Sequence, residues 1–143
     1  MWKVETTRQF DVWFAELRDD EKVEIAGLVG ALQVAGPQLK RPHADTLNGS
    51  VYANMKELRG KTSTAVLRVA FAFDPLQTAI LLTGGDKSGV SEKHFYRQLI
   101  AKADDLYKAH LAAVQERKRQ QEAKEAREQR EHSRLKRKKG KGK

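Results

Sequence analysis

Residues 52–87, YANMKELRGKTSTAVLRVAFAFDPLQTAILLTGGDK, decide the fold because they contain three apolar runs separated by two short, turn-rich breaks. In the middle run, large apolar residues occupy alternate positions, with small or charged residues between them. This alternation is typical of a strand with one buried face. The breaks RGKTS at 59–63 and DPLQ at 74–77 hold residues that favour turns, including a proline. The stretch therefore predicts an antiparallel meander of three strands.

The basic residues of the meander are expected at strand ends, in loops and on its open face. Arg68 alternates with Leu67 and Val69, so its side chain should point away from the core. Three more cations lie near the ends of the predicted strands: Arg59, Lys61 and Lys87. A small sheet with basic groups on its uncovered side is suited to binding a phosphate backbone.

The residues before the meander predict one more strand and a helical hairpin. The alternating residues 2–5 predict an edge strand that joins the meander. Residues 6–9, TTRQ, fit a capping box that starts a first helix at Thr6. Three carboxylates at 19–21 favour the start of a second helix, which should end at Gly36 and Pro37. Residues 37–50 contain two prolines and an Asn-Gly pair, and they predict a loop.

A last helix should begin near Ser91 and dock on the body through an apolar stripe that ends at Val114. The predicted fold class is therefore α+β. A small antiparallel sheet, in the order β-α-α-β-β-β-α, would carry a helical hairpin packed on it and a long C-terminal helix.

The net charge of +9 is concentrated at the C-terminal end of the chain. Residues 116–143 contain 13 Lys and Arg against 5 Asp and Glu, whereas residues 1–115 contain 15 against 14. Residues 1–115 are therefore predicted to form one domain, and residues 116–143 a basic tail. The tail should continue as a solvated helix that frays towards Arg134 and ends disordered. It could serve only for solubility, or it could attract RNA, DNA or the ribosome.

The composition also excludes several kinds of site. The chain has no cysteine, which removes disulfides, thiolate nucleophiles and cysteine zinc sites. No apolar run approaches the roughly 20 residues of a membrane span, and the N-terminus does not follow the order of a secretory signal. We therefore expect a cytoplasmic protein without a membrane partner. The segment GGDKSG at 84–89 lacks phosphate-loop spacing and predicts a backbone bend. His43 lies in a predicted loop, where a lone histidine is more often structural or exposed than catalytic.

The order of these elements resembles that of the RelE/ParE toxin superfamily. Within it, the chain is similar to the HigB-like, phage Gp49-like branch of type II toxin–antitoxin toxins. The resemblance covers roughly residues 2–111 and depends on four segments: LNGSVYANMKELR, AVLRVAFAF, AILLTGGDKSG and FYRQLIAKADDLYKAHL. The extension after Glu116 departs from the usual compact form of the family.

The resemblance implies a ribosome-dependent endoribonuclease that cuts messenger RNA, inhibits translation and needs no metal or cofactor. A helix-turn-helix antitoxin would neutralise it, and the complex of the two would bind operator DNA. Arg68 matches the strand arginine of the family, and we expect it to stabilise charge on the scissile phosphate. The expected backbone-binding residues are Lys56, Arg59 and Lys61. The other expected catalytic residues are Lys87, His94 and Tyr96.

Two questions stay open at the level of the sequence. The general base is not determined, and the candidates are Glu57, Lys87, His94 and Tyr96. Because this acid–base set is poor, two other functions remain in view. One is a ParE-like poison of DNA gyrase, and the other is a non-catalytic basic protein that binds nucleic acid through its tail.

Overall fold

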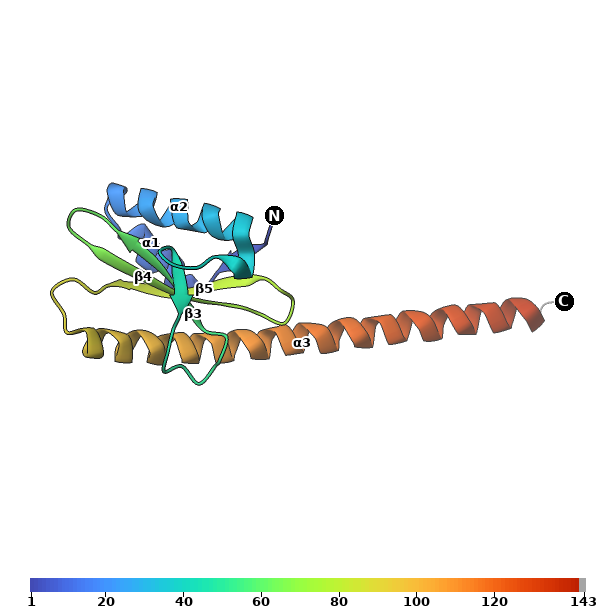
Figure 1. Cartoon of the computed structure of the whole chain (residues 1–143). Coiled ribbons are helices and arrows are strands. Elements are labelled where there is room, and N and C mark those ends of the chain that lie inside the picture. The colour runs from blue at the N-terminus through green and yellow to red at the C-terminus, as the bar shows by residue number, and fades with distance from the viewer. Residues whose placement is uncertain (142–143) are drawn as a thin grey trace. The chain divides into compact units, whose positions relative to one another are not determined.

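The computed structural model describes residues 1–141. Within residues 1–108, helices lie on both faces of one sheet (Figure 1). The elements are β1 (Val4–Thr6), α1 (Arg8–Ala15), α2 (Asp19–Ala35), the short 3-10 helix η1 (Gly36–Gln38), β2 (Ala44–Thr46), β3 (Lys56–Lys61), β4 (Val66–Phe73), β5 (Ala79–Asp86) and α3 (Glu92–Lys141). The chain divides into two compact units, Met1–Lys108 and Ala109–Lys143, and α3 continues from the first into the second. No helix among the described residues is long and apolar enough to cross a membrane.

The strands form one five-stranded sheet in the order β1-β5-β4-β3-β2. The predicted meander is confirmed, since β3, β4 and β5 pair antiparallel in sequence order. The N-terminal strand is also confirmed as an edge, but it pairs with β5 in parallel, so the sheet is mixed and not purely antiparallel. The α+β class predicted from the sequence is correct.

Three local predictions need correction. Residues 44–46 form β2, which pairs antiparallel with β3 inside the segment predicted as a loop. Three residues are too few to show a strand period, so only long-range pairing reveals this strand. The first hairpin turns later than expected, because β3 extends to Lys61 and the Thr62 amide bonds to the Ala65 carbonyl. The cap of α1 is Thr7 and not Thr6, since the Thr7 hydroxyl accepts the Phe10 amide at 3.1 Å.

Most other boundary predictions are confirmed. The second helix begins with three acidic residues in its first turn and ends at Gly36. The second hairpin closes through hydrogen bonds between the backbones of Asp74, Gln77 and Thr78. The hydroxyl of Ser91 accepts the His94 amide at the start of α3.

Both faces of the sheet are covered, which changes the environment of Arg68. On one face, Leu67, Val69 and Phe71 pack in a core with residues of α1 and α2. The opposite face was expected to be open. Arg68 lies there as predicted, but the first turns of α3 cover it, and it is only 6% exposed. The alternation of β4 predicted the face correctly and could not show that a distant helix buries it.

Gly84 and Gly85 lie within β5 and do not form the predicted bend. A Cβ atom on Gly84 would lie 2.5 Å from the ring of Trp13, and one on Gly85 would lie 2.9 Å from the ring of Phe95. The two glycines thus let an α1 ring and an α3 ring approach the strand backbone.

The helix of the tail extends further along the chain than the sequence predicted. A disordered end was expected from Arg134 to Lys143, but helix α3 continues through Arg134 to Lys141. Residues 142–143 lie outside the described residues. Strong helix formers support this length. Two ion pairs also contribute, Glu116 with Arg119 and Glu131 with Arg134. In both pairs the acid comes first, which is the better orientation in a helix.

We predict that Gly84→Ala lowers the free energy of unfolding by about 1–3 kcal/mol, because the added methyl group overlaps the Trp13 ring. Urea unfolding monitored by circular dichroism measures the change. Gly27→Ala is the matched control. Nothing lies within 4 Å of a Cβ atom on Gly27 in α2, so that change should stabilise the protein by about 0.5–1 kcal/mol. Equal stability of Gly84→Ala and wild type would show that Trp13 does not pack tightly on β5.

Candidate RNA-cleavage site

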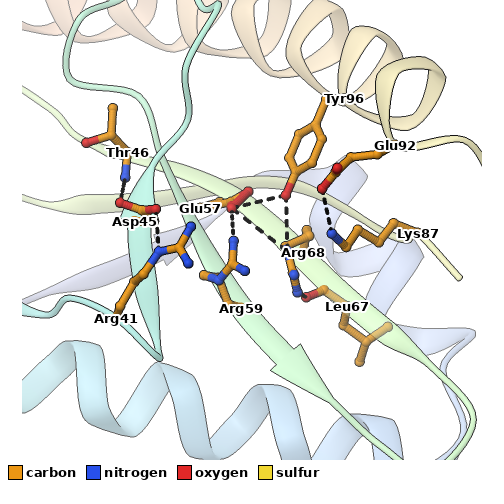
Figure 2. Close-up of polar contacts among 10 residues, drawn as sticks. All are labelled: Arg41, Asp45, Thr46, Glu57, Arg59, Leu67, Arg68, Lys87, Glu92 and Tyr96. Carbon is orange, nitrogen blue, oxygen red and sulfur yellow. Dashed lines mark hydrogen bonds and ion pairs between the residues drawn. The ribbon is translucent and has the colours of Figure 1, made fainter.

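The carboxylate of Glu57 is the centre of a buried polar cluster between the sheet and α3 (Figure 2). Its Oε1 atom accepts a hydrogen bond from the Arg59 guanidinium at 2.6 Å and one from the Tyr96 hydroxyl at 3.1 Å. The same oxygen lies 3.8 Å from Nε of Arg68. The Arg68 Nε donates to the Tyr96 hydroxyl at 3.2 Å, and its Nη1 donates to the Leu67 carbonyl at 2.9 Å. One anion therefore connects β3, β4 and α3.

The sheet register explains why this anion is needed. Arg59 and Arg68 are direct cross-strand partners in the β3–β4 pair. Like charges in that position repel each other. The side chain of Arg68 is 7% exposed and that of Glu57 is 4% exposed, so water screens them little. Glu57 lies close to both guanidinium groups, and this allows two arginines to face each other across the sheet.

Tyr96 completes the cluster from the first turns of α3. Burial raises the pKa of its hydroxyl above the ordinary value, and the hydrogen bond to Glu57 acts in the same direction, while Arg68 opposes it. The hydroxyl therefore stays protonated at neutral pH. It can donate to Glu57 and accept from Arg68 at once, and so holds both side chains in place.

Lys87 lies beside this cluster at the end of β5. Its Nζ atom is 2.9 Å from the Glu92 carboxylate and 5.7 Å from the centre of the Tyr96 ring. The ammonium lowers the pKa of Glu92 below its usual value. The ion pair and the aromatic ring together place a cation next to Arg68 and Tyr96.

Two adjoining pockets open onto the cluster. The hairpin pocket has a volume of about 640 Å³ and is lined by four cations, Arg41, Arg59, Lys61 and Arg68, together with Glu24, Pro42, His43, Gly60 and Val66. The helix pocket has a volume of about 330 Å³ and is lined by Glu57, Tyr96, Glu92, Arg41, Arg59 and residues 45–48. Arg41 and Arg59 line both pockets. A phosphate chain entering the hairpin pocket would therefore meet several guanidinium groups before it reached Glu57.

Sequence analysis missed Arg41 and did not recognise the central place of Glu57. Arg41 lies in the segment predicted as a loop, and its Nε donates to Asp45 at 2.8 Å. This bond lowers the pKa of Asp45. The only signal in the sequence was a basic and an acidic residue four positions apart outside a helix. The place of Glu57 depends on the strand register and on α3, which no local pattern shows.

The structure assembles most of the predicted site residues but separates two of them. Arg68, Tyr96, Lys87 and Arg59 lie in the cluster or next to it, and Lys61 lines the hairpin pocket. Lys56 lies on the opposite face of β3, where its Nζ donates to the Pro37 carbonyl. His94 is exposed and lines a different pocket, with Gly85, Phe95 and Lys102 among its neighbours. It is two residues from Tyr96, and that spacing places side chains on different faces of a helix.

The Oε2 atom of Glu57 is the unusual feature of the cluster. It is buried, and no donor among the described residues bonds to it. Buried carboxylate oxygens normally have a partner, so Oε2 keeps an acceptor position that no described residue uses. Within residues 1–141, no group of three or more His, Cys, Asp or Glu residues is arranged to hold a metal ion.

Comparison with known proteins places the chain among toxin-related sequences. The family described as phage-derived protein Gp49-like matches residues 12–108. The chain is 41% identical over 105 residues to a Mycobacterium tuberculosis (strain ATCC 25618 / H37Rv) protein named "Putative toxin HigB3", covering 73% of this chain and 90% of that protein. It is 34% identical over 118 residues to a protein of the same strain named "Putative toxin HigB2", covering 82% of this chain and 58% of that protein.

We predict that Glu57→Gln lowers the free energy of unfolding by about 3–5 kcal/mol, because it leaves Arg68 buried opposite Arg59 without an anion. Arg59→Gln should lower it by only about 1 kcal/mol, since the Arg68–Glu57 pair remains. The double variant Glu57→Gln/Arg68→Met should recover much of the loss, because no unpaired charge is buried. Urea unfolding measures all three variants. A Glu57→Gln protein as stable as wild type would contradict the compensating role of the carboxylate.

Proposed function

The chain belongs to the phage-derived Gp49-like family and is similar to proteins named "Putative toxin HigB3" and "Putative toxin HigB2". We propose that it is the toxin of a type II toxin–antitoxin system and cuts messenger RNA on the ribosome. The observation that supports cleavage is the Glu57 carboxylate, whose Oε1 atom lies beside two guanidinium groups and whose Oε2 atom has no partner among the described residues. Glu57 also lines the helix pocket. This set offers a proton acceptor and phosphate-binding groups within one site.

The reaction is attack of the RNA on itself. Glu57 takes the proton of a ribose 2′-hydroxyl, and the 2′-oxygen forms a bond to the adjacent phosphorus. The bond from phosphorus to the 5′-oxygen breaks, and that oxygen takes a proton from the enzyme. The products are a 2′,3′-cyclic phosphate and a free 5′-hydroxyl. A carboxylate base and an ammonium acid satisfy the proton balance.

Arg59 makes the base available when RNA binds. In the free protein it bonds to Glu57, and its side chain is 21% exposed, so it can reach a ligand in either pocket. A scissile phosphate competes for this guanidinium, because phosphate accepts a bidentate pair of hydrogen bonds. When Arg59 turns to the phosphate, Oε1 of Glu57 loses one donor and can accept the proton of the ribose hydroxyl instead. Binding of the substrate therefore activates the base.

The remaining cations act on the developing charge. Arg68 is held by Leu67 and Tyr96, so its guanidinium needs little reorganisation to stabilise the pentacoordinate phosphate. Lys87 is placed by Glu92 and the Tyr96 ring, and its ammonium donates the proton to the leaving oxygen. Arg41 and Lys61, on the wall of the hairpin pocket, bind the flanking phosphates.

The partners follow from the proposed class. A helix-turn-helix antitoxin covers the cationic pockets and prevents access of RNA, and the complex of toxin and antitoxin binds operator DNA. The ribosome presents the messenger strand. The site of action is then the cytoplasm, where the ribosome meets its messenger.

We predict that induced expression arrests growth and produces mRNA fragments whose ends depend on passage of the ribosome. Arg59→Gln should lower the fragment yield by roughly tenfold to a hundredfold, the scale for loss of one charged hydrogen-bonding partner of a phosphate. Arg68→Lys should lower it by roughly tenfold to a hundredfold, because an ammonium cannot replace the planar fork. Primer extension at matched protein levels measures the yield.

Lys56→Gln is the matched control for Arg59→Gln. It removes one charge from the same strand on the opposite face, so the fragment yield should stay at the wild-type level. Equal losses in both variants would place the site elsewhere. Intact transcripts together with blocked gyrase would support the ParE-like alternative instead.

We also predict that a chain ending after Gln115 keeps its melting temperature and its ribosome-dependent cleavage. No side chain described between residues 115 and 140 is buried, so little packing is lost. Circular dichroism and the same fragment assay provide the measurements. Loss of all activity in a folded, shortened chain would favour the alternative in which the tail binds nucleic acid and the body has no catalytic role.

A further inference from the structure

The arginines of the second unit gather on one face of α3. Residues 116–143 contain six arginines. With 100° between successive residues of a helix, five of them lie within about 80° of one another around the axis. We call this face the arginine ridge, and it consists of Arg119, Arg127, Arg130, Arg134 and Arg137. All five side chains are exposed. The ridge spans about 27 Å at a rise of 1.5 Å per residue.

The lysines and glutamates of residues 116–143 are distributed differently around the helix axis. Lys118, Lys136 and Lys139 lie on the face opposite the ridge, whereas Lys124 lies between the two faces and Lys138 lies beside the ridge, about 20° from Arg127. Three glutamates, at 122, 125 and 128, share that far face. Ion pairs hold Glu116 to Arg119 and Glu131 to Arg134, and Ala123 is the small residue between the first two ridge positions. A segment that serves only for solubility does not require five of its six arginines to share one face.

We propose that the arginine ridge is an RNA-binding surface that follows the phosphate backbone of a structured RNA. Guanidinium groups suit this partner because each binds phosphate through two parallel hydrogen bonds and can also stack on an unpaired base. A partner protein helix is a poorer fit, since this part of α3 has no apolar stripe.

The choice of RNA over DNA rests on the proposed function. The arginine ridge is defined by the spacing of its arginines and does not depend on that function. The same helix supplies Tyr96 to the candidate cleavage site and the arginines to the ridge. Two RNA contacts on one chain raise the local concentration of RNA at the cleavage site. The ridge would therefore increase the time that the protein spends on the ribosome without taking part in the chemistry.

The experiment compares two variants of the full chain with the same net charge. Arg127→Gln/Arg130→Gln/Arg134→Gln removes three charges from the ridge. Lys118→Gln/Lys136→Gln/Lys139→Gln removes three from the opposite face. Glutamine is a good helix former, so both proteins should keep the helicity of α3, which circular dichroism confirms. Binding to a short RNA hairpin, a DNA duplex of matched sequence and a single-stranded RNA is measured by fluorescence anisotropy over a range of salt concentrations.

The arginine variant should bind the RNA hairpin on the order of tenfold more weakly, and its salt slope should fall by roughly two to three units. The lysine variant should lose less than about one unit of slope. Equal losses of affinity in the two variants would show that net charge alone sets the binding. That result would contradict the proposal that the arginine ridge binds RNA. Tighter binding of wild type to the DNA duplex than to the RNA hairpin would overturn the choice of RNA. Because binding is measured without cleavage, neither result depends on whether the chain is a ribonuclease.

Discussion

The burial of one carboxylate between two cross-strand arginines is the constraint on which the rest of the first unit depends. Arg59 and Arg68 face each other in the β3–β4 register, and Glu57 lies close to both. If the β3–β4 register or the position of α3 shifted by one residue, a buried charge would be left unpaired. Such a charge is far more unfavourable than the loss of an exposed ion pair. Tyr96 extends the same network to α3. The polar cluster therefore specifies how the sheet and helix meet, as well as containing the groups suited to chemistry.

Close packing on the two faces of β5 brings that network together. Gly84 accepts the Trp13 ring on the side of α1, and Gly85 accepts the Phe95 ring on the side of α3. Phe95 precedes Tyr96 on the helix, so the depth at which the Phe95 ring lies on the strand also sets the distance between the Tyr96 hydroxyl and Arg68. A side chain at Gly85 would move the helix away from the sheet and lengthen these hydrogen bonds. The packing of the Phe95 ring on Gly85 thus determines the hydrogen-bond distances in the polar cluster.

The two units differ in how they use positive charge. In the first, cations near the site are held by carboxylates, as Arg59 is by Glu57 and Lys87 by Glu92. Their positions are defined, and a ligand must compete for them, which favours selectivity over affinity. In the second, basic side chains on α3 are exposed along a helix with few acids. Such charges are screened by salt but attract polyanions over longer distances. The first unit therefore holds the cations near its site in defined positions, whereas the second unit exposes its basic side chains to solvent.

The sequence by itself determined whatever depends on neighbours along the chain. Alternation predicted the meander and the face on which Arg68 lies, carboxylates at 19–21 predicted the start of α2, and composition predicted an exposed tail that begins as a helix. Tertiary structure alone decided what covers each face and which distant residues meet. Arg68 is buried because α3 returns across the sheet, β2 exists only through pairing with β3, and Glu57 meets Tyr96 only because α3 packs on that face. The period of a strand shows that two faces differ, but burial, register and charge pairing are set by long-range packing, which no local pattern encodes.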